Sequence, residues 1–249
     1  MPIYKGARLK VKRANEHISE LTHIVERLKK ALLVTADIEP GTGCEFIKCD
    51  LAEIEYRAFD DLPAVLGDAI HNLKCALDHA WYETVTRIIP NGDWESTKFP
   101  AYATAKDVEA ALRNREIHVS APNFFTLITT KIQPHDRGDF AIRTVHKLDI
   151  RDKHTLLIPV VQYTNITSIR VADQDGSVWP GQTYDANFPF PHYLKFERGL
   201  HVKDPGRPSL EIMFKYGDFE REARAVEALQ LYSSHILMIV ELLEQFTES

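Results

Sequence analysis

Residues 67–79 read GDAIHNLKCALDH, and this stretch indicates an amphipathic helix at the centre of the fold. We expect this helix to span residues 63–88, because Pro90, Asn91 and Gly92 follow it and would end it. On a projection of about 100° per residue, the apolar side chains of the stretch gather in one sector of roughly 140°. These predicted core positions are Ala69, Ile70, Leu73, Ala76, Leu77, Ala80 and Trp81.

The opposite side of this helix carries residue types that are unusual on a face in contact with water. It consists of Asp68, His71, Asn72, Lys74, Cys75, Asp78, His79 and Tyr82. Solvated helix faces usually carry Glu, Lys, Gln and Arg, which favour the helix. His, Asn, Cys and Asp form helices less readily but are versatile proton donors, proton acceptors and metal ligands. The pattern therefore predicts either a polar network or a chemical site.

In the first of these interpretations, the polar residues form a buried hydrogen-bond network that fixes the register against a neighbouring helix. Its members are His71, Asn72, Asp78 and His79. Cys75 is then a small packed side chain rather than a reactive thiol. In the second interpretation, the same side chains act on a bound molecule.

A second helix with polar functional groups is predicted over residues 138–153. His146, Asp149 and Lys153 project on a shared side of it, at spacings where an exposed ion pair is also routine. His154 lies where the helix gives way to a strand, and the ends of elements are favoured positions for binding residues.

The whole chain indicates an α+β fold, with a bundle of three long helices, shorter helices and an antiparallel β-sheet packed on one side. The predicted helices cover residues 12–33, 63–88, 105–131, 138–153 and 218–246. A hairpin is expected over residues 32–56 and further strands over residues 155–217, which join into one sheet. Residues 178–201, rich in Pro and aromatic residues, are expected to form a long loop that is either functional or poorly ordered. We expect a single domain of 249 residues.

Composition narrows the class of partner. A formal net charge of −6 and a pI near 6.0 exclude the overall positive field that binding to duplex DNA usually needs. The three cysteines form no CxxC pair, and the N-terminal sequence MPIYKGARLKVKR lacks the apolar run of a signal peptide. We therefore expect a cytoplasmic protein with no membrane partner, for which an RNA partner, a protein partner and a homodimer stay open.

Three motifs resemble those of a widespread group of uncharacterised bacterial proteins. Members of that group carry a GDALHNLRSALDHL-type helix, then a QPY-type and a D-x-x-DKHR-type motif. Here the corresponding segments are GDAIHNLKCALDH, IQPHDRGD at residues 132–139 and HKLDIRDKH at residues 146–154, in the same order. The matching positions are Gly67, Asp68, His71, Asn72, Leu73, Ala76, Leu77, Asp78, His79, Gln133, Pro134, Asp149, Asp152, Lys153 and His154. The chain departs at Lys74, Cys75 and Thr155, where the group usually has Arg, Ser and Arg.

The RSALDH segment of that group is similar to the R-x4-H arrangement of helical HEPN ribonucleases. In those enzymes a histidine acts on the ribose hydroxyl or the leaving oxygen while an arginine holds the phosphate. Lys74 and His79 stand at these positions here, and lysine keeps the charge but loses the planar fork that binds phosphate bidentately. Arg113 and His118 fit the literal pattern outside the matching motifs, which we interpret as coincidence.

Two classes of function follow. The first is an enzyme that cleaves a phosphodiester in RNA, with histidines as acid or base, lysines that stabilise phosphate charge and aspartates that orient a histidine. Its candidate catalytic residues are His71, Lys74, Asp78, His79, His146, Asp149, Lys153 and His154. A variant is a hydrolase with a divalent metal, whose candidate ligands are His71, Asp78, His79, His146, Asp149 and His154. The second class is a non-enzymatic interaction or sensor protein whose histidines are structural and whose residues 178–201 contact a partner.

Overall fold

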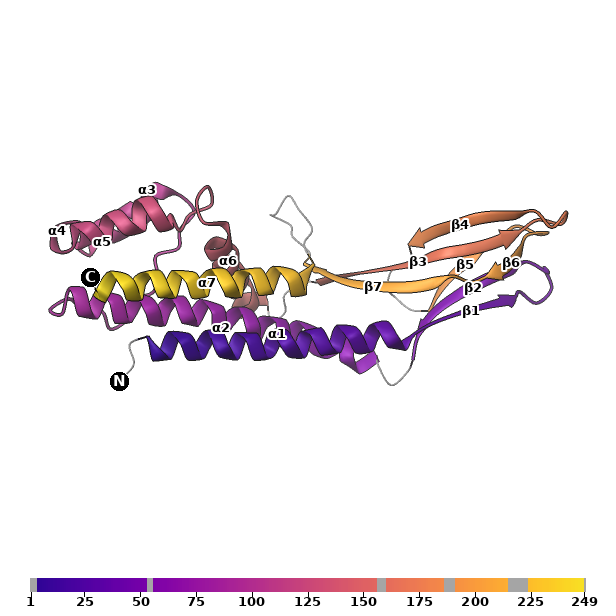
Figure 1. Cartoon of the computed structure of the whole chain (residues 1–249), viewed down its shortest axis with the longest axis horizontal. Coiled ribbons are helices and arrows are strands. Elements are labelled where there is room, and N and C mark those ends of the chain that lie inside the picture. The colour runs from indigo at the N-terminus through magenta and orange to yellow at the C-terminus, as the bar shows by residue number, and fades with distance from the viewer. Residues whose placement is uncertain (1–3, 53–55, 156–159, 186–190, 215–223, 249) are drawn as a thin grey trace. The chain divides into compact units, whose positions relative to one another are not determined.

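The computed structural model describes residues 4–52, 56–155, 160–185, 191–214 and 224–248 (Figure 1). The elements in these ranges confirm the α+β class. The chain divides into two compact units. The helical unit comprises residues 1–19, 64–158 and 227–249, and the sheet unit comprises residues 20–63 and 159–226. That the chain is a single domain stays a prediction.

Three long helices supply the core of the helical unit (Figure 1). They are α1 (Lys5–Ala31), α2 (Tyr56–Ile88) and α7 (Ala225–Glu248). The fully buried Tyr4 connects them, because its hydroxyl lies 2.6 Å from Thr84 Oγ1 in α2 and donates to the Leu243 carbonyl of α7 at 3.2 Å. A further hydrogen bond joins α7 to α1, from Ser233 Oγ to Asn15 Oδ1 at 2.6 Å. The predicted bundle of three long helices is therefore present in this unit.

The shorter helices of the helical unit follow α2 along the chain. They are α3 (Ala105–Asn114), α4 (Ile117–Ser120), α5 (Pro122–Thr126), a π-helical turn η2 (Leu127–Ile132) and α6 (Phe140–Thr155). The N-terminus of α3 is capped by Thr104, whose hydroxyl accepts a hydrogen bond from the backbone N–H of Asp107. Phe124 packs between Trp81 and Phe246, with ring centroids 5.4 Å from each. The predicted helical character of residues 105–131 is thus confirmed.

Two predicted helix starts are wrong. α1 begins at Lys5 rather than at residue 12, and α2 begins at Tyr56 rather than at residue 63. Pro63 lies inside α2. A proline removes one backbone hydrogen bond from a helix, and the favourable packing of neighbouring turns can outweigh that loss. α7 begins at Ala225, and residues 218–223 of its predicted range lie outside the described residues.

α7 is the only helix in the described part of the chain that is long and apolar enough to cross a membrane. Its apolar residues Leu229, Ile236, Val240 and Leu243 are buried in the protein. A helix that is buried in the core of a bundle can be as long and as apolar as a helix that spans a membrane. That the chain has no membrane partner stays a prediction.

In the sheet unit, the strands form two antiparallel sheets, so the predicted single sheet is wrong. The first sheet has the order β1 (Leu32–Ile38), β2 (Glu45–Leu51) and β5 (His192–Lys195). The second has β3 (Val160–Ala172) at its centre, paired with β4 (Val178–Asp185), β6 (His201–Asp204) and β7 (Arg207–Phe214). The hairpin of β1 and β2 confirms the prediction for that region, with Leu32 opposite Leu51 and Ile38 opposite Glu45.

Residues 178–201 are not the long loop that we predict from their composition. Strands β4 and β5 occupy much of this stretch, because its Val, Trp, Tyr and Leu residues also favour the pleated surface of a sheet. Residues 186–190 and the predicted strand residues 156–159 and 215–217 lie outside the described residues. Glu45 joins the two sheets, since its carboxylate lies 2.8 Å from His201 Nδ1 and accepts from the Val202 N–H at 2.6 Å.

Candidate functional site

The predicted core face of α2 is confirmed by its burial. Its members are at most 1% exposed, and they are Ala69, Ile70, Leu73, Ala76, Leu77, Ala80 and Trp81. The opposite, polar face is divided between two neighbours. One side lies along α6 and the other lies along α1, and the two sides have different contacts.

Helix α6 runs antiparallel to α2 and approaches it closely. His71 in α2 contacts Asp149 in α6, and one turn earlier Gly67 lies against Asp152. A Cβ atom on Gly67 would lie only 2.6 Å from Asp152 Oδ1, so a larger residue at this position would displace the Asp152 carboxylate. We call the contact the α2–α6 seam. It consists of Gly67, His71, Lys74, Cys75 and Asp78 from α2 and of His146, Asp149, Asp152 and Lys153 from α6.

A chain of contacts at the centre of the seam is built around His71. Its Nδ1 lies 2.8 Å from Asp149 Oδ1, and its Nε2 lies 3.4 Å from Cys75 Sγ. The other oxygen of Asp149 accepts a hydrogen bond from Lys153 Nζ at 2.6 Å. The Asp149 side chain is 4% exposed, whereas that of His71 is 43% exposed. A carboxylate can only accept a hydrogen bond, so the Nδ1–H of His71 donates to Asp149 and the lone pair of the imidazole lies on Nε2.

Lys74 has a different environment from the one predicted for a phosphate ligand. It is 3% exposed and forms an ion pair with Asp78 one turn along α2. The same Asp78 oxygen accepts a hydrogen bond from the backbone N–H of Phe99 at 2.9 Å. The ion pair therefore anchors the segment that follows α2, and a buried, paired ammonium group is poorly placed to meet a substrate from solvent.

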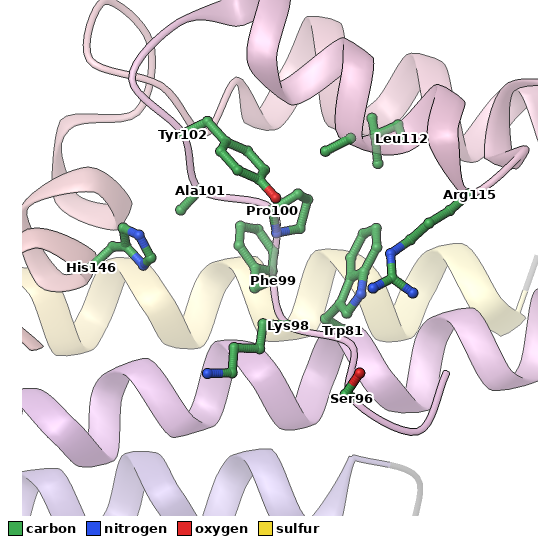
Figure 2. Close-up of a pocket in the computed structure, with 11 residues that line it drawn as sticks. Trp81, Ser96, Lys98, Phe99, Pro100, Ala101, Tyr102, Leu112, Arg115 and His146 are labelled. Atoms are coloured by element: carbon green, nitrogen blue, oxygen red, sulfur yellow. The ribbon is translucent and has the colours of Figure 1, made fainter. Parts of the chain in front are cut away.

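His146 lies on the same side of α6 as Asp149 and is half-buried. Its Nδ1 is buried and has no hydrogen-bond partner among the described residues. Burial lowers the pKa of His146 to about 4, and the positive charges of Lys74 and Arg143 act in the same direction. The ring is therefore uncharged at neutral pH. It lines a cavity of about 300 Å³ (Figure 2).

His79 belongs to the other side of the polar face. A Cβ atom on Gly6 of α1 would lie 3.3 Å from its Nδ1, and the residue is exposed. Asn72 lies on the same side, where its Oδ1 accepts from Lys10 Nζ of α1 at 3.4 Å. His71 contacts α6, whereas His79, about two turns further along α2, lies against α1. The prediction that His71 and His79 share one site with His146 is therefore wrong for His79.

The structure brings together most of the predicted site residues. Those in the seam are His71, Lys74, Asp78, His146, Asp149 and Lys153. For His154 only the backbone, in the last turn of α6, is described, and its side chain lies outside the described residues. No three His, Cys, Asp or Glu side chains of the described part of the chain form a group that could hold a metal ion. A metal site that includes His154 stays a prediction.

Cys75 and Lys10 contact this region of α2 but were not among the predicted catalytic residues. Cys75 contacts His71 one turn away in the same helix, and the spacing of four residues was the signal that could have identified this pair. Lys10 comes from α1, more than sixty residues earlier in the chain. No local pattern indicates that it meets α2, since only the packing of the bundle places it there.

Comparisons of the chain with protein-family models, with curated proteins and with solved structures find no match. The resemblance to the bacterial group and the HEPN analogy stay predictions.

Proposed function

We propose that this protein cleaves RNA at a phosphodiester bond without a metal ion and that His71 is the acid–base group. The observation that carries the proposal is a half-exposed imidazole held through its Nδ1 by the buried carboxylate of Asp149. This arrangement leaves Nε2 of a half-exposed ring with the Cys75 thiol as its neighbour. Imidazole is the side chain best suited to exchange a proton near neutral pH.

The proposed reaction is an internal transfer. His71 Nε2 takes the proton of a ribose 2′-hydroxyl, and the 2′-oxygen forms a bond to phosphorus while the bond to the 5′-oxygen breaks. The proton is returned to the 5′-oxygen, so the products are a 2′,3′-cyclic phosphate and a 5′-hydroxyl, with no water consumed. Asp149 stabilises the imidazolium that exists between the two proton transfers.

Two ammonium groups support the binding of phosphate at this point. Lys10 and Lys153 both act electrostatically on the Cys75 thiol, which contacts His71, and Lys153 also pairs with Asp149. Each is a point charge that can stabilise the additional negative charge on the phosphate oxygens. In this proposal they take the role that the sequence pattern suggests for Lys74, which is buried in its own ion pair.

Cys75 occupies the place of the substrate hydroxyl when no RNA is bound. Burial raises the pKa of its thiol, so the sulfur keeps its proton and is a weak donor toward His71 Nε2. A ribose hydroxyl is a stronger hydrogen-bond partner and can displace this contact.

The test uses a labelled single-stranded oligoribonucleotide in the presence of EDTA, with cyclic phosphate termini as the readout. We expect His71→Gln to reduce the rate by about 100-fold or more, the usual contribution of an acid–base group. His79→Gln is the matched control, because His79 faces α1, and it should cleave at the wild-type rate. Loss of cleavage in the His79 variant alone, or a requirement for metal, would contradict the proposal.

A second candidate is an interaction protein in which the seam is purely structural. The observation that favours it is the saturation of Asp149, since both of its oxygens have partners and the group is nearly inaccessible. In that case the wild-type protein does not cleave RNA, and His71→Gln changes only the free energy of unfolding, measured by urea titration. The two candidates are thus separated by one pair of variants.

A further inference from the structure

The cavity beside His146 is a separate feature of the helical unit (Figure 2). It is formed by α2, by the segment that follows α2, and by α3 and α6. The lining residues are Trp81, Ser96, Lys98, Phe99, Pro100, Ala101, Tyr102, Ala111, Leu112, Arg115 and His146. Its volume of about 300 Å³ lies at the lower end of the range for small-molecule sites, so it fits one compact ligand and not a polymer.

The charge of the lining is positive in a chain whose overall charge is negative. Lys98 and Arg115 are cations, and no Asp or Glu lines the cavity. Arg115 is held in position, because its guanidinium carbon lies 5.7 Å from the centroid of the Trp94 ring and its Nη1 donates to the Asp93 carbonyl at 3.3 Å. A fixed guanidinium and a second cation in a lining without Asp or Glu favour an anionic ligand.

The uncharged polar groups of the lining supply hydrogen bonds. His146 Nδ1 is buried without a partner among the described residues, so this ring keeps an unused hydrogen-bonding atom beside the cavity. Ser96 and Tyr102 add two hydroxyl-bearing side chains to the lining, and Figure 2 shows the Tyr102 hydroxyl directed toward Pro100.

The apolar wall is rigid and aromatic. Trp81 and Phe99 are at most 2% exposed, and their rings pack edge to face with centroids 5.9 Å apart. The indole N–H of Trp81 donates to Thr97 at 2.8 Å, and the Phe99 backbone is bonded to Asp78. Because these contacts are made within the protein itself, the wall is held in position and suits a flat ring.

We propose that this cavity binds a nucleoside monophosphate, with its phosphate compensated by Lys98 and Arg115 and its base against the aromatic wall. The dianionic phosphate matches a lining with two cations and no Asp or Glu, and the base offers a flat surface and a hydrogen-bonding edge to the aromatic residues and the hydroxyl groups of the lining. The cavity is distinct from the hydrogen bonds of His71, because within the described residues none of its lining residues is hydrogen-bonded to His71, although His146 belongs to the seam as well as to the lining.

The experiment is calorimetric titration of the full chain with AMP, GMP, CMP and UMP in separate runs. We expect at least one of them to bind with a Kd below about 1 mM. Inorganic phosphate and adenosine, which each carry one half of the ligand, should bind at least about tenfold more weakly. His71→Gln should leave the affinity unchanged, so a failure of the proposed RNA cleavage does not affect this result.

Three variants locate the binding. Arg115→Gln and Lys98→Gln should each weaken the nucleotide by about tenfold, the usual effect of losing one charge-assisted hydrogen bond. Ala111→Leu fills the cavity without changing its charge and should abolish binding. Arg113→Gln is the matched control. Arg113 lies in the last turn of α3, two residues before Arg115, but it pairs with Glu109 and does not line the cavity.

Three results would overturn the proposal. The first is no binding of any of the four nucleotides. The second is binding of inorganic phosphate as tight as that of the best nucleotide, because the base would then contribute nothing. The third is an equal loss of affinity in the Arg113 and Arg115 variants, which would indicate nonspecific attraction by surface charge.

Discussion

The two sides of the polar face of α2 carry similar residue types in different environments. On the side of α6, His71 is hydrogen-bonded to a buried carboxylate and Lys74 is 3% exposed in an ion pair. On the side of α1, His79 is exposed and its ring lies against the small residue Gly6. A histidine on one helix is therefore an oriented group or a surface group according to which neighbour it meets.

The reason for this difference lies in the partner helices. α6 brings Asp149, Asp152 and His146 against α2, so polar groups meet polar groups in a space with little water. Such contacts are stronger than at a surface and are more costly to break on one side only. The part of α1 that meets α2 brings Gly6 and Lys10. Substitutions on the two sides should therefore differ in effect.

The largest difference is expected at Asp149. Asp149→Ala removes the acceptor of both His71 and Lys153 and leaves a buried gap, so we expect a loss of about 3 kcal/mol in the free energy of unfolding. His79→Ala, on the side of α1, should change it by less than about 0.5 kcal/mol. Urea titration of the two variants measures the contrast, and equal losses would mean that the seam has no special role.

A smaller effect is expected from the titration of His146. Its folded pKa of about 4 lies below the ordinary value of 6.5, so the unfolded chain binds the proton more readily. Stability from this group is complete above pH 6.5 and is lost as the pH falls toward 4. We expect the loss between pH 7 and pH 4.5 to be about 2 kcal/mol.

His146→Gln isolates this contribution, because the difference in unfolding free energy between wild type and variant should change over that pH window. His235 provides the opposite case in the same unit. Its hydrogen bond to Asp139 at 2.5 Å raises its pKa, so its contribution is complete below pH 6.5 and is lost as the pH rises through the raised value. A His146 variant with the same pH dependence as wild type would contradict the buried position of the ring.

The smallest contrast concerns the two glycines that face the polar side chains. Gly67→Ala places a methyl group in the Asp152 carboxylate, and we expect a net destabilisation of about 1 kcal/mol despite the better helix propensity of alanine. Gly6→Ala meets only the exposed His79 ring, which can move, so the change should be close to zero. In a variant that already carries Asp152→Ala, Gly67→Ala should become stabilising, and a double-mutant cycle by thermal unfolding measures the coupling.

Much of the helical structure follows from local patterns. The apolar residues that recur every three to four positions along α1, Ile18, Leu21, Ile24, Val25 and Leu28, are all buried. The whole predicted core face of α2 is buried as well, and the range Ala105–Asn114 is a helix with a capping threonine. These features repeat every three to four residues, so the chain determines them through helix geometry alone.

The sequence alone also located the candidate site, since unusual polar residues on α2 and α6 meet in the seam. It did not determine that Lys74 would be buried or that His79 would lie against α1. Nor did it determine that Lys10 would contact α2 or that the strands would form two sheets. Periodicity states which side chains share a face but not which distant segment covers it. That choice depends on contacts between residues far apart in the chain, and only the folded protein contains them.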